Sequence, residues 1–179
     1  MDSVQLIQQM KTLSIIASSI VFSTVVAIGC FSTPQEQIVE AEKLVQRTSQ
    51  IVLAKVVEAR ADLKTGLVIY SFRAEKVIKG KVSESFVIVG DALVDPEALT
   101  TFQDHRLDGF WEGDAGRCQH DADCKIHPSF VVGATYLVFM DQPYHRKSFE
   151  QIAMLGQDPD TKDKWLKWVE ESVKAQPSR

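Results

Sequence analysis

The residues with the clearest capacity for chemistry are two cysteines and two histidines that lie close together. Cys118, His120, Cys124 and His127 have the spacing C-x-H-x3-C-x2-H. These side chains are of the types that bind tetrahedral zinc, but the spacing matches no common zinc motif. The N-terminal segment described below predicts export, and thiols in exported proteins oxidise. The sequence therefore favours a disulfide between Cys118 and Cys124. A zinc site formed by all four side chains and a pair of free thiols are the alternatives.

The third cysteine, Cys30, ends an apolar segment that follows Lys11. Ala27 and Gly29 are small residues at the spacing that a signal peptidase requires. This pattern predicts a signal peptide over residues 1–29 and resembles a bacterial lipobox, in which the cysteine thiol takes a diacylglycerol and becomes the mature N-terminus. Ordinary signal cleavage and a retained anchor are the alternatives, because the segment approaches the ~20 apolar residues that span a bilayer.

Two methionines, Met1 and Met10, are candidates for the first residue of the signal peptide. The stretch from Met1 carries Asp2 and no basic residue up to Gln9, which suits an export signal poorly, so Met10 is an alternative start. Export would place the chain at the cell envelope or surface, held there by lipid, or secreted if the lipid is absent. With Cys30 assigned to lipid, the two remaining cysteines form an even pair.

The charge composition of the chain limits which kinds of partner it is expected to bind. The chain has 20 Lys and Arg residues against 24 Asp and Glu residues, and the two signs are interspersed. No basic face is expected, which argues against binding to nucleic acid or to an anionic membrane surface. The part after the signal is long enough for one domain with its own core.

Motifs for catalysis are missing from the sequence. It contains no nucleophile elbow, no phosphate-binding glycine loop and no HExxH helix. His105 and His145 would act as bases only if the fold paired one with a nucleophile. Asp114, Asp121 and Asp123 lack the spacing of a calcium loop. We therefore expect a protein that is not an enzyme and that needs no cofactor.

The helices and strands that must position these residues are predicted from the spacing of apolar residues and from the turn residues between them. After a tether over residues 30–35, Thr33 to Glu36 has the form of a capping box with Pro34 at the first helical position, which predicts an amphipathic helix. Apolar runs bounded by turn residues predict five strands, over residues 51–59, 67–78, 85–89, 134–141 and 149–155, and in the second of them Val68, Tyr70, Phe72 and Ala74 lie on one face. Asp158 and Pro159 predict the start of a C-terminal amphipathic helix within residues 158–179.

Residues 91–133 lack any sustained period and are expected to form a long ordered loop inserted in the domain. Within it, Phe110 and Trp111 stand beside acidic residues. They are a candidate contact patch for a partner, because aromatic residues are enriched at interface cores. The alternative is that Trp111 covers one end of the fold.

The order of these pieces resembles the netrin-like domains related to tissue inhibitors of metalloproteinases. The resemblance rests mainly on Val77-Ile78-Lys79-Gly80 and on the stretch from Gly133 to Phe139, and it covers roughly residues 35–155. It implies a mainly β fold with flanking helices, in which the domain at residues 36–157 forms a five-stranded Greek-key barrel of the oligonucleotide/oligosaccharide-binding (OB) type. The strand count leads independently to the same architecture.

The resemblance also implies a second role for Cys30. In the inhibitors, a mature N-terminal cysteine offers its amine and carbonyl to the zinc of a protease. Ser32 stands here where the inhibitors have another cysteine. The sequence therefore favours a lipid-anchored binding module with a protein or envelope ligand. The alternatives are a secreted metalloprotease inhibitor that uses Cys30, and a metal-binding or metal-dependent protein that uses the loop over residues 105–127.

Overall fold

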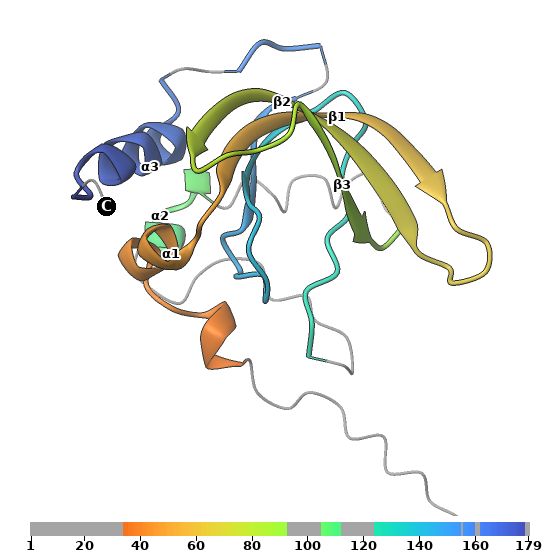
Figure 1. Cartoon of the computed structure of the whole chain (residues 1–179), viewed down its shortest axis with the longest axis horizontal. Coiled ribbons are helices and arrows are strands. Elements are labelled where there is room, and N and C mark those ends of the chain that lie inside the picture. The colour runs from red at the N-terminus through yellow and green to blue at the C-terminus, as the bar shows by residue number, and fades with distance from the viewer. Residues whose placement is uncertain (1–33, 93–104, 112–123, 155, 160–161, 178–179) are drawn as a thin grey trace, which may run out of the picture.

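A computed structural model of the chain describes residues 34–92, 105–111, 124–154, 156–159 and 162–177. The helices are a 3-10 helix and three α-helices: η1 (Gln35–Gln37), α1 (Ala41–Arg47), α2 (Asp108–Trp111) and α3 (Lys164–Lys174). The strands are β1 (Ile51–Ala61), β2 (Val68–Lys79), β3 (Ser85–Gly90), β4 (Thr135–Phe139) and β5 (Phe149–Ala153). Figure 1 shows the strands arching over the middle of the molecule, with α1, α2 and α3 grouped at one end of the sheet.

The five strands form one sheet in the order β3-β2-β1-β4-β5, and each neighbouring pair is antiparallel. The predicted meander of the first three strands is confirmed. So is the mainly β class with helices beside the sheet. Among the described residues no pairing joins the edge strands β3 and β5, so the sheet is not closed.

Alternation along the strands divides the apolar residues between two cores, because successive side chains point to opposite faces. On β1, Val52, Ala54 and Val56 belong to one core, whereas Ile51 and Leu53 belong to the other. The first, called the inner core, lies under the arch of the sheet. The second, called the outer core, lies between the sheet and the helices.

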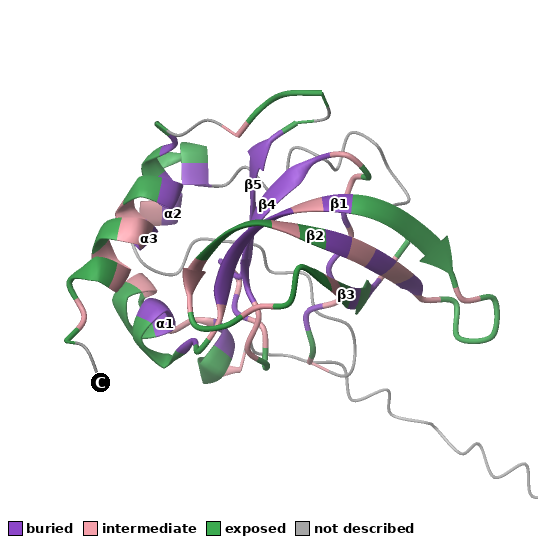
Figure 2. Cartoon of the chain, turned by 45° about the horizontal axis from the view of Figure 1, so that its top comes forward, coloured by how far each residue is buried: buried purple, intermediate pink, exposed green. Residues whose placement is uncertain are grey.

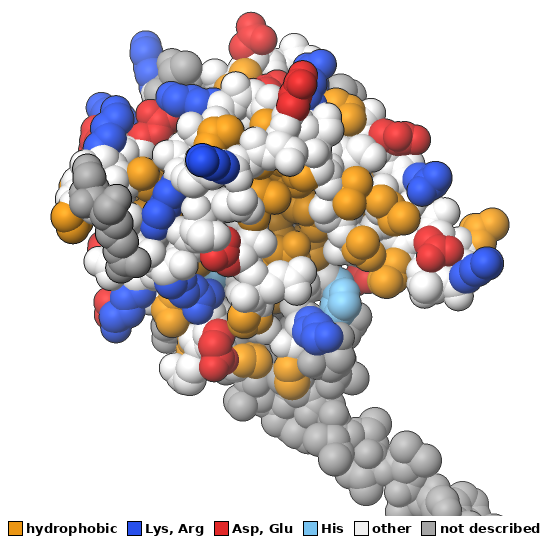
Figure 3. All heavy atoms as spheres, viewed as in Figure 1, with side chains coloured by type: hydrophobic (Ala, Val, Ile, Leu, Met, Phe, Trp, Pro, Cys, Tyr) orange, Lys and Arg blue, Asp and Glu red, His pale blue; other side chains and the backbone are white. Residues whose placement is uncertain are grey.

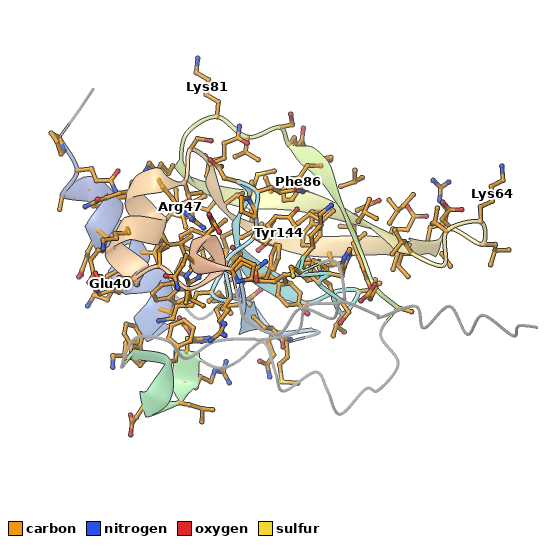
Figure 4. The ribbon with its side chains drawn as sticks, turned by 90° about the horizontal axis from the view of Figure 1, so that it is seen from below. Glu40, Arg47, Lys64, Lys81, Phe86 and Tyr144 are labelled. Carbon is orange, nitrogen blue, oxygen red and sulfur yellow. The ribbon has the colours of Figure 1, made fainter. Side chains whose placement is uncertain are left out.

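The inner core is centred on Phe130, from the segment before β4. Its ring makes edge-to-face contacts with Tyr70, Phe72, Tyr136 and Phe149, at centroid separations of 5.0 to 5.2 Å. Aromatic pairs of this geometry add to the stability that burial alone supplies. Phe86 and Tyr144 pack against the same core, and Figure 4 shows both near the middle of the molecule. Burial is lost toward the tip of the β1–β2 hairpin (Figure 2).

The outer core joins β1, β4 and β5 to the helices. Trp165 of α3 is fully buried and contacts Phe110 of α2 edge to face, and it stacks on Phe139 of β4. Leu44 and Val45 of α1 complete the contact. The predicted C-terminal helix therefore packs on the sheet with its apolar stripe inward.

Both predicted helix starts differ from the structure. The N-terminal segment forms η1 and then α1 with a break between them, because tertiary partners bind backbone carbonyls there: the Arg146 N–H donates to the Gln37 carbonyl, and His145 contacts the Val39 carbonyl. The C-terminal helix begins at Lys164 and not at Pro159. Its cap is Asp163, whose carboxylate accepts from two backbone N–H groups.

Candidate functional site

A groove of about 580 Å³ opens at the end of the sheet where η1 lies. We call it the end groove. Its walls come from η1, from the beginning of β2, from the end of β3, from the segment before Phe130 and from the turn between β4 and β5. The lining residues are Pro34, Glu36, Gln37, Leu67, Val89, Cys124, Lys125, Ile126, His127, Gln142, Pro143 and Tyr144. Its size is within the range of sites for small ligands.

Gln37 fastens one wall of the end groove. Its side chain is buried, and its amide Nε2 donates to the Cys124 carbonyl at 2.5 Å, which joins η1 to the segment before Phe130. Its Oε1 has no hydrogen-bond partner among the described residues. A buried carbonyl oxygen without a partner is costly, so the bond from Nε2 to Cys124 is what stabilises this side chain.

The same segment, over residues 124–128, is held on its other side by a close approach between β3 and Pro128. The Asp91 N–H donates to the Pro128 carbonyl at 3.1 Å, and the Tyr70 hydroxyl donates to the Asp91 carbonyl at 2.6 Å. Gly90 is needed here, because a Cβ at that position would collide with the carbonyl oxygen of Pro128. These contacts fix the segment that carries Cys124 and His127 against β3.

Apolar side chains make up most of the groove wall. Leu67, Val89 and Ile126 supply aliphatic surface, and Val89 is 48% exposed. Lys125 and Glu36 bring charges of both signs to the rim. In Figure 3, hydrophobic side chains gather in the hollow at the centre of the molecule and continue along the face beside it.

A second cluster of chemically capable groups is buried between α2, β5 and α3. His105 Nδ1 lies 2.7 Å from Glu150 Oε2, and His105 Nε2 lies 2.8 Å from Asp163 Oδ2. Burial alone would lower the pKa of His105, but the hydrogen bonds to the Asp163 and Glu150 carboxylates outweigh burial and raise the pKa to about 9. His105 is therefore an imidazolium at neutral pH.

This cluster is suited to a structural role. The three side chains are between 1% and 7% exposed, so a substrate does not reach them. Both ring nitrogens of His105 face carboxylates, which leaves neither for a metal ion. Within the described ranges, no group of three His, Cys, Asp or Glu side chains is arranged to hold a metal.

His145 is buried beside the end groove in the opposite charge state. Its Nδ1 accepts from the Lys147 N–H at 2.9 Å, so its Nε2, 2.7 Å from the Val39 carbonyl, carries the proton and donates. Burial lowers the pKa of His145 to about 4, and the nearby charges of Arg47, Lys147 and Arg146 act in the same direction. The neutral ring fixes the turn before β5 to the backbone ahead of α1.

The predicted aromatic patch lies along a smaller cavity of about 150 Å³ between the helices. Phe110 is 1% exposed and belongs to the outer core, whereas Trp111 is half-buried. The Trp111 indole donates to the His105 carbonyl at 2.9 Å, and the Lys164 ammonium lies 4.2 Å from the centre of its ring. A partner-binding role for Phe110 and Trp111 stays a prediction.

A further hollow, of about 790 Å³, lies between the C-terminal ends of α1 and α3. Lys79 and Arg47 line it, but their cationic groups serve the fold. The Lys79 ammonium donates to the Val45 carbonyl at 2.6 Å, and Arg47 donates to the Glu36 carbonyl at 2.6 Å. We therefore regard this hollow as a place where helix ends are capped.

The structure brings together only part of what the sequence singled out. Cys124 and His127 both line the end groove, whereas Cys30, Cys118 and His120 lie outside the described residues. Asp114, Asp121 and Asp123 lie outside them too. The disulfide, the zinc alternative and the lipid site therefore stay predictions.

Sequence reasoning missed the carboxylate partners of His105. Glu150 and Asp163 are 45 and 58 positions away from it along the chain, in segments without a shared motif. A polar residue inside the apolar strand at residues 149–155 was the available signal, since a glutamate that faces a core needs a partner.

No protein-family model matches the chain, and no curated protein matches it significantly. None of the helices in the described part of the chain has the length and apolar character that crossing a membrane requires.

Proposed function

We propose that the chain is an exported, lipid-anchored binding module without catalytic activity, and that its ligand occupies the end groove. The observation that carries this proposal is the place of the groove relative to Cys30. Pro34 lines the groove and follows Cys30 by four residues. A chain spans at most ~3.6 Å per residue, so the edge of the groove at Pro34 lies within ~14 Å of Cys30.

We also propose that the domain is a netrin-like barrel of the OB type. The strand order supports this, with β1 between β2 and β4 and a long connection between β3 and β4. OB folds are partly open five-stranded Greek-key barrels, and many bind ligands through the loops at one end. The end groove is built from such loops together with the ends of β2 and β3.

The absence of a catalytic role is supported by the surroundings of the two buried histidines. His105 is enclosed by carboxylates of the fold, and both ring nitrogens of His145 contact the backbone. Among the described residues, no hydroxyl or thiol group contacts a ring nitrogen of either histidine. Binding uses what the groove offers, which is chiefly an apolar wall.

The proposal is tested in cells that make the full chain with a photo-crosslinking residue at Val89. The matched control carries the same residue at Val87, which is on the same strand and 60% exposed but does not line the groove. We expect an adduct of one reproducible mass at Val89 and none at Val87. Equal labelling at both positions, or none at either, contradicts a ligand in the groove.

Anchoring is tested with Cys30→Ser in the same cells. We expect the substituted protein to leave the membrane fraction while its domain stays folded, because the thiol is needed only for lipid attachment. If the substituted protein stays in the membrane fraction at the normal amount, the lipid anchor is excluded and the apolar segment before Cys30 must hold the chain.

A further inference from the structure

We infer that the occupant of the end groove is the acyl chain of a membrane lipid. This inference rests on the proposed function, since it requires that the domain be anchored through Cys30. Three observations carry it: the aliphatic wall of the groove, the charged residues at its rim, and the short chain between the groove and the anchor.

The wall is suited to a hydrocarbon chain. Leu67, Val89 and Ile126 come from three separate segments and present aliphatic surface to one space, to which Pro143 and Tyr144 add two rings. Val89 is 48% exposed although it is large and apolar. Each methylene group that leaves water for such a surface favours binding. A volume of about 580 Å³ is ample for one extended or folded chain.

The groove lining combines charged and apolar residues, as a lipid combines a headgroup and an acyl chain. Lys125 and Glu36 are exposed and bring charges to the opening, whereas Ile126 is buried and adds aliphatic surface deeper in the groove. Lys125 is exposed and carries the positive charge that a phosphate or carboxylate headgroup attracts. An acyl chain would therefore enter with its headgroup left at the rim.

The short tether brings the groove to its lipid source. The tether from Cys30 to Pro34 spans at most ~14 Å, and the headgroup layer on each side of a bilayer is ~5–8 Å thick, since ~40–45 Å in total contains a hydrocarbon core of ~30 Å. Pro34 is therefore held at the membrane surface or just outside it. A ligand that diffuses from solution does not need this arrangement. A lipid in the same leaflet is always within reach of a domain held so closely.

The test uses the full, lipid-anchored chain reconstituted into vesicles of phosphatidylethanolamine and phosphatidylglycerol that contain a phospholipid with a diazirine in its acyl chain. After illumination, mass spectrometry maps the labelled residues. We expect labels on the groove residues, chiefly near Val89 and Ile126. A carboxylate in the groove should displace the acyl chain, so Val89→Asp should reduce groove labelling at least tenfold.

Val87→Asp is the matched control, and its groove labelling should stay within twofold of the original. Leu67→Glu is a second groove variant in case Val89→Asp alters β3, and melting temperatures verify that each variant folds. Labels confined to residues outside the groove, or equal losses in Val89→Asp and Val87→Asp, overturn the acyl-chain inference.

The two proposals fail in different ways. If the photo-crosslinker at Val89 captures a polypeptide in cells and the vesicle lipids do not label the groove, the binding module stands and the acyl chain is excluded. If Cys30 carries no lipid and no adduct forms at Val89, the proposed function itself is wrong.

Discussion

Two regions of the molecule each contain a buried histidine, and the two rings differ in charge at neutral pH. His105, in the outer core, is held between Glu150 and Asp163 and is charged. His145, beside the end groove, is held by a backbone donor and a backbone acceptor and is neutral. Both are 2% exposed, so burial does not distinguish them.

The difference shows that the partners of a buried group decide its charge. Burial lowers the pKa of both rings. Two carboxylates reverse this effect at His105, whereas the cations near His145 reinforce it. An ionic cluster therefore adds to the apolar packing between the helices and the sheet, whereas His145 is held by neutral hydrogen bonds.

The largest expected effect comes from removing one carboxylate at His105. Glu150→Gln keeps the shape but leaves the imidazolium with one charged partner, and it should reduce the free energy of unfolding by about 3 kcal/mol. Glu170→Gln is the control, because its ion pair with Lys76 is at the surface, and it should cost no more than about 1 kcal/mol. Urea unfolding measures both. Equal losses would show that the buried cluster has no special role.

The pH dependence of stability should reveal both histidines. Folded His105 keeps its proton up to about pH 9, whereas the unfolded ring loses it near 6.5, so stability falls as pH rises through this window. Folded His145 takes a proton only near pH 4, so stability falls as pH drops from 6.5 toward 4. The free energy of unfolding should peak near pH 6.5.

Single substitutions separate the two limbs of that profile. His145→Gln should flatten the acid limb and leave the alkaline limb, whereas His105→Gln should flatten the alkaline limb. Each limb should amount to about 3 kcal/mol, because each pKa is displaced from 6.5, to about 9 for His105 and to about 4 for His145. Melting temperatures at several pH values measure this. An unchanged acid limb in His145→Gln would show that other groups control it.

In the region of the end groove, the predicted disulfide would add a covalent constraint to the segment that Gln37 binds through the Cys124 carbonyl. Cys118→Ser and Cys124→Ser should each reduce stability by about 2 kcal/mol, and the double change should be no worse than either one. A chelator should have no effect. Thiol counting on denatured protein checks the bond directly, and two free thiols with stoichiometric zinc would replace the disulfide by the metal site.

The smallest effect separates two roles of Asp163. Its Oδ1 accepts from the N–H groups of Trp165 and Leu166, and its Oδ2 faces His105. Asp163→Asn keeps the helix cap and removes the charge, whereas Asp163→Ala removes both. The alanine variant should be less stable than the asparagine variant by about 1 kcal/mol. Equal stability would assign the whole effect to the ion pair.

All five strands could be predicted from the sequence, because short apolar runs bounded by turn residues mark them, with a clear period of two in β2 and a continuous apolar run in the fully buried β4. Strands predicted at residues 51–59 and 67–78 are found at Ile51–Ala61 and Val68–Lys79. The helix starts could not be predicted as well. The Gln37 and Val39 carbonyls bind residues more than 100 positions away, and no local pattern shows such partners.

The candidate site was predictable only in part, for a similar reason. The segment with Cys124 and His127 was singled out by its residue types, and it does line the end groove. Leu67 and Val89 are ordinary strand residues in the sequence. Only the fold shows that they face the same space as Ile126.

The measurement that tests the account most directly is the mass of the mature N-terminal peptide, taken from protein purified from membranes. The account predicts a chain that begins at Cys30 and carries a diacylglyceryl group on its thiol. Such a chain places the edge of the end groove at Pro34 within ~14 Å of the lipid-bearing Cys30. A chain that retains the residues before Cys30, or one that begins at Cys30 with a free thiol and a free amine, would contradict it.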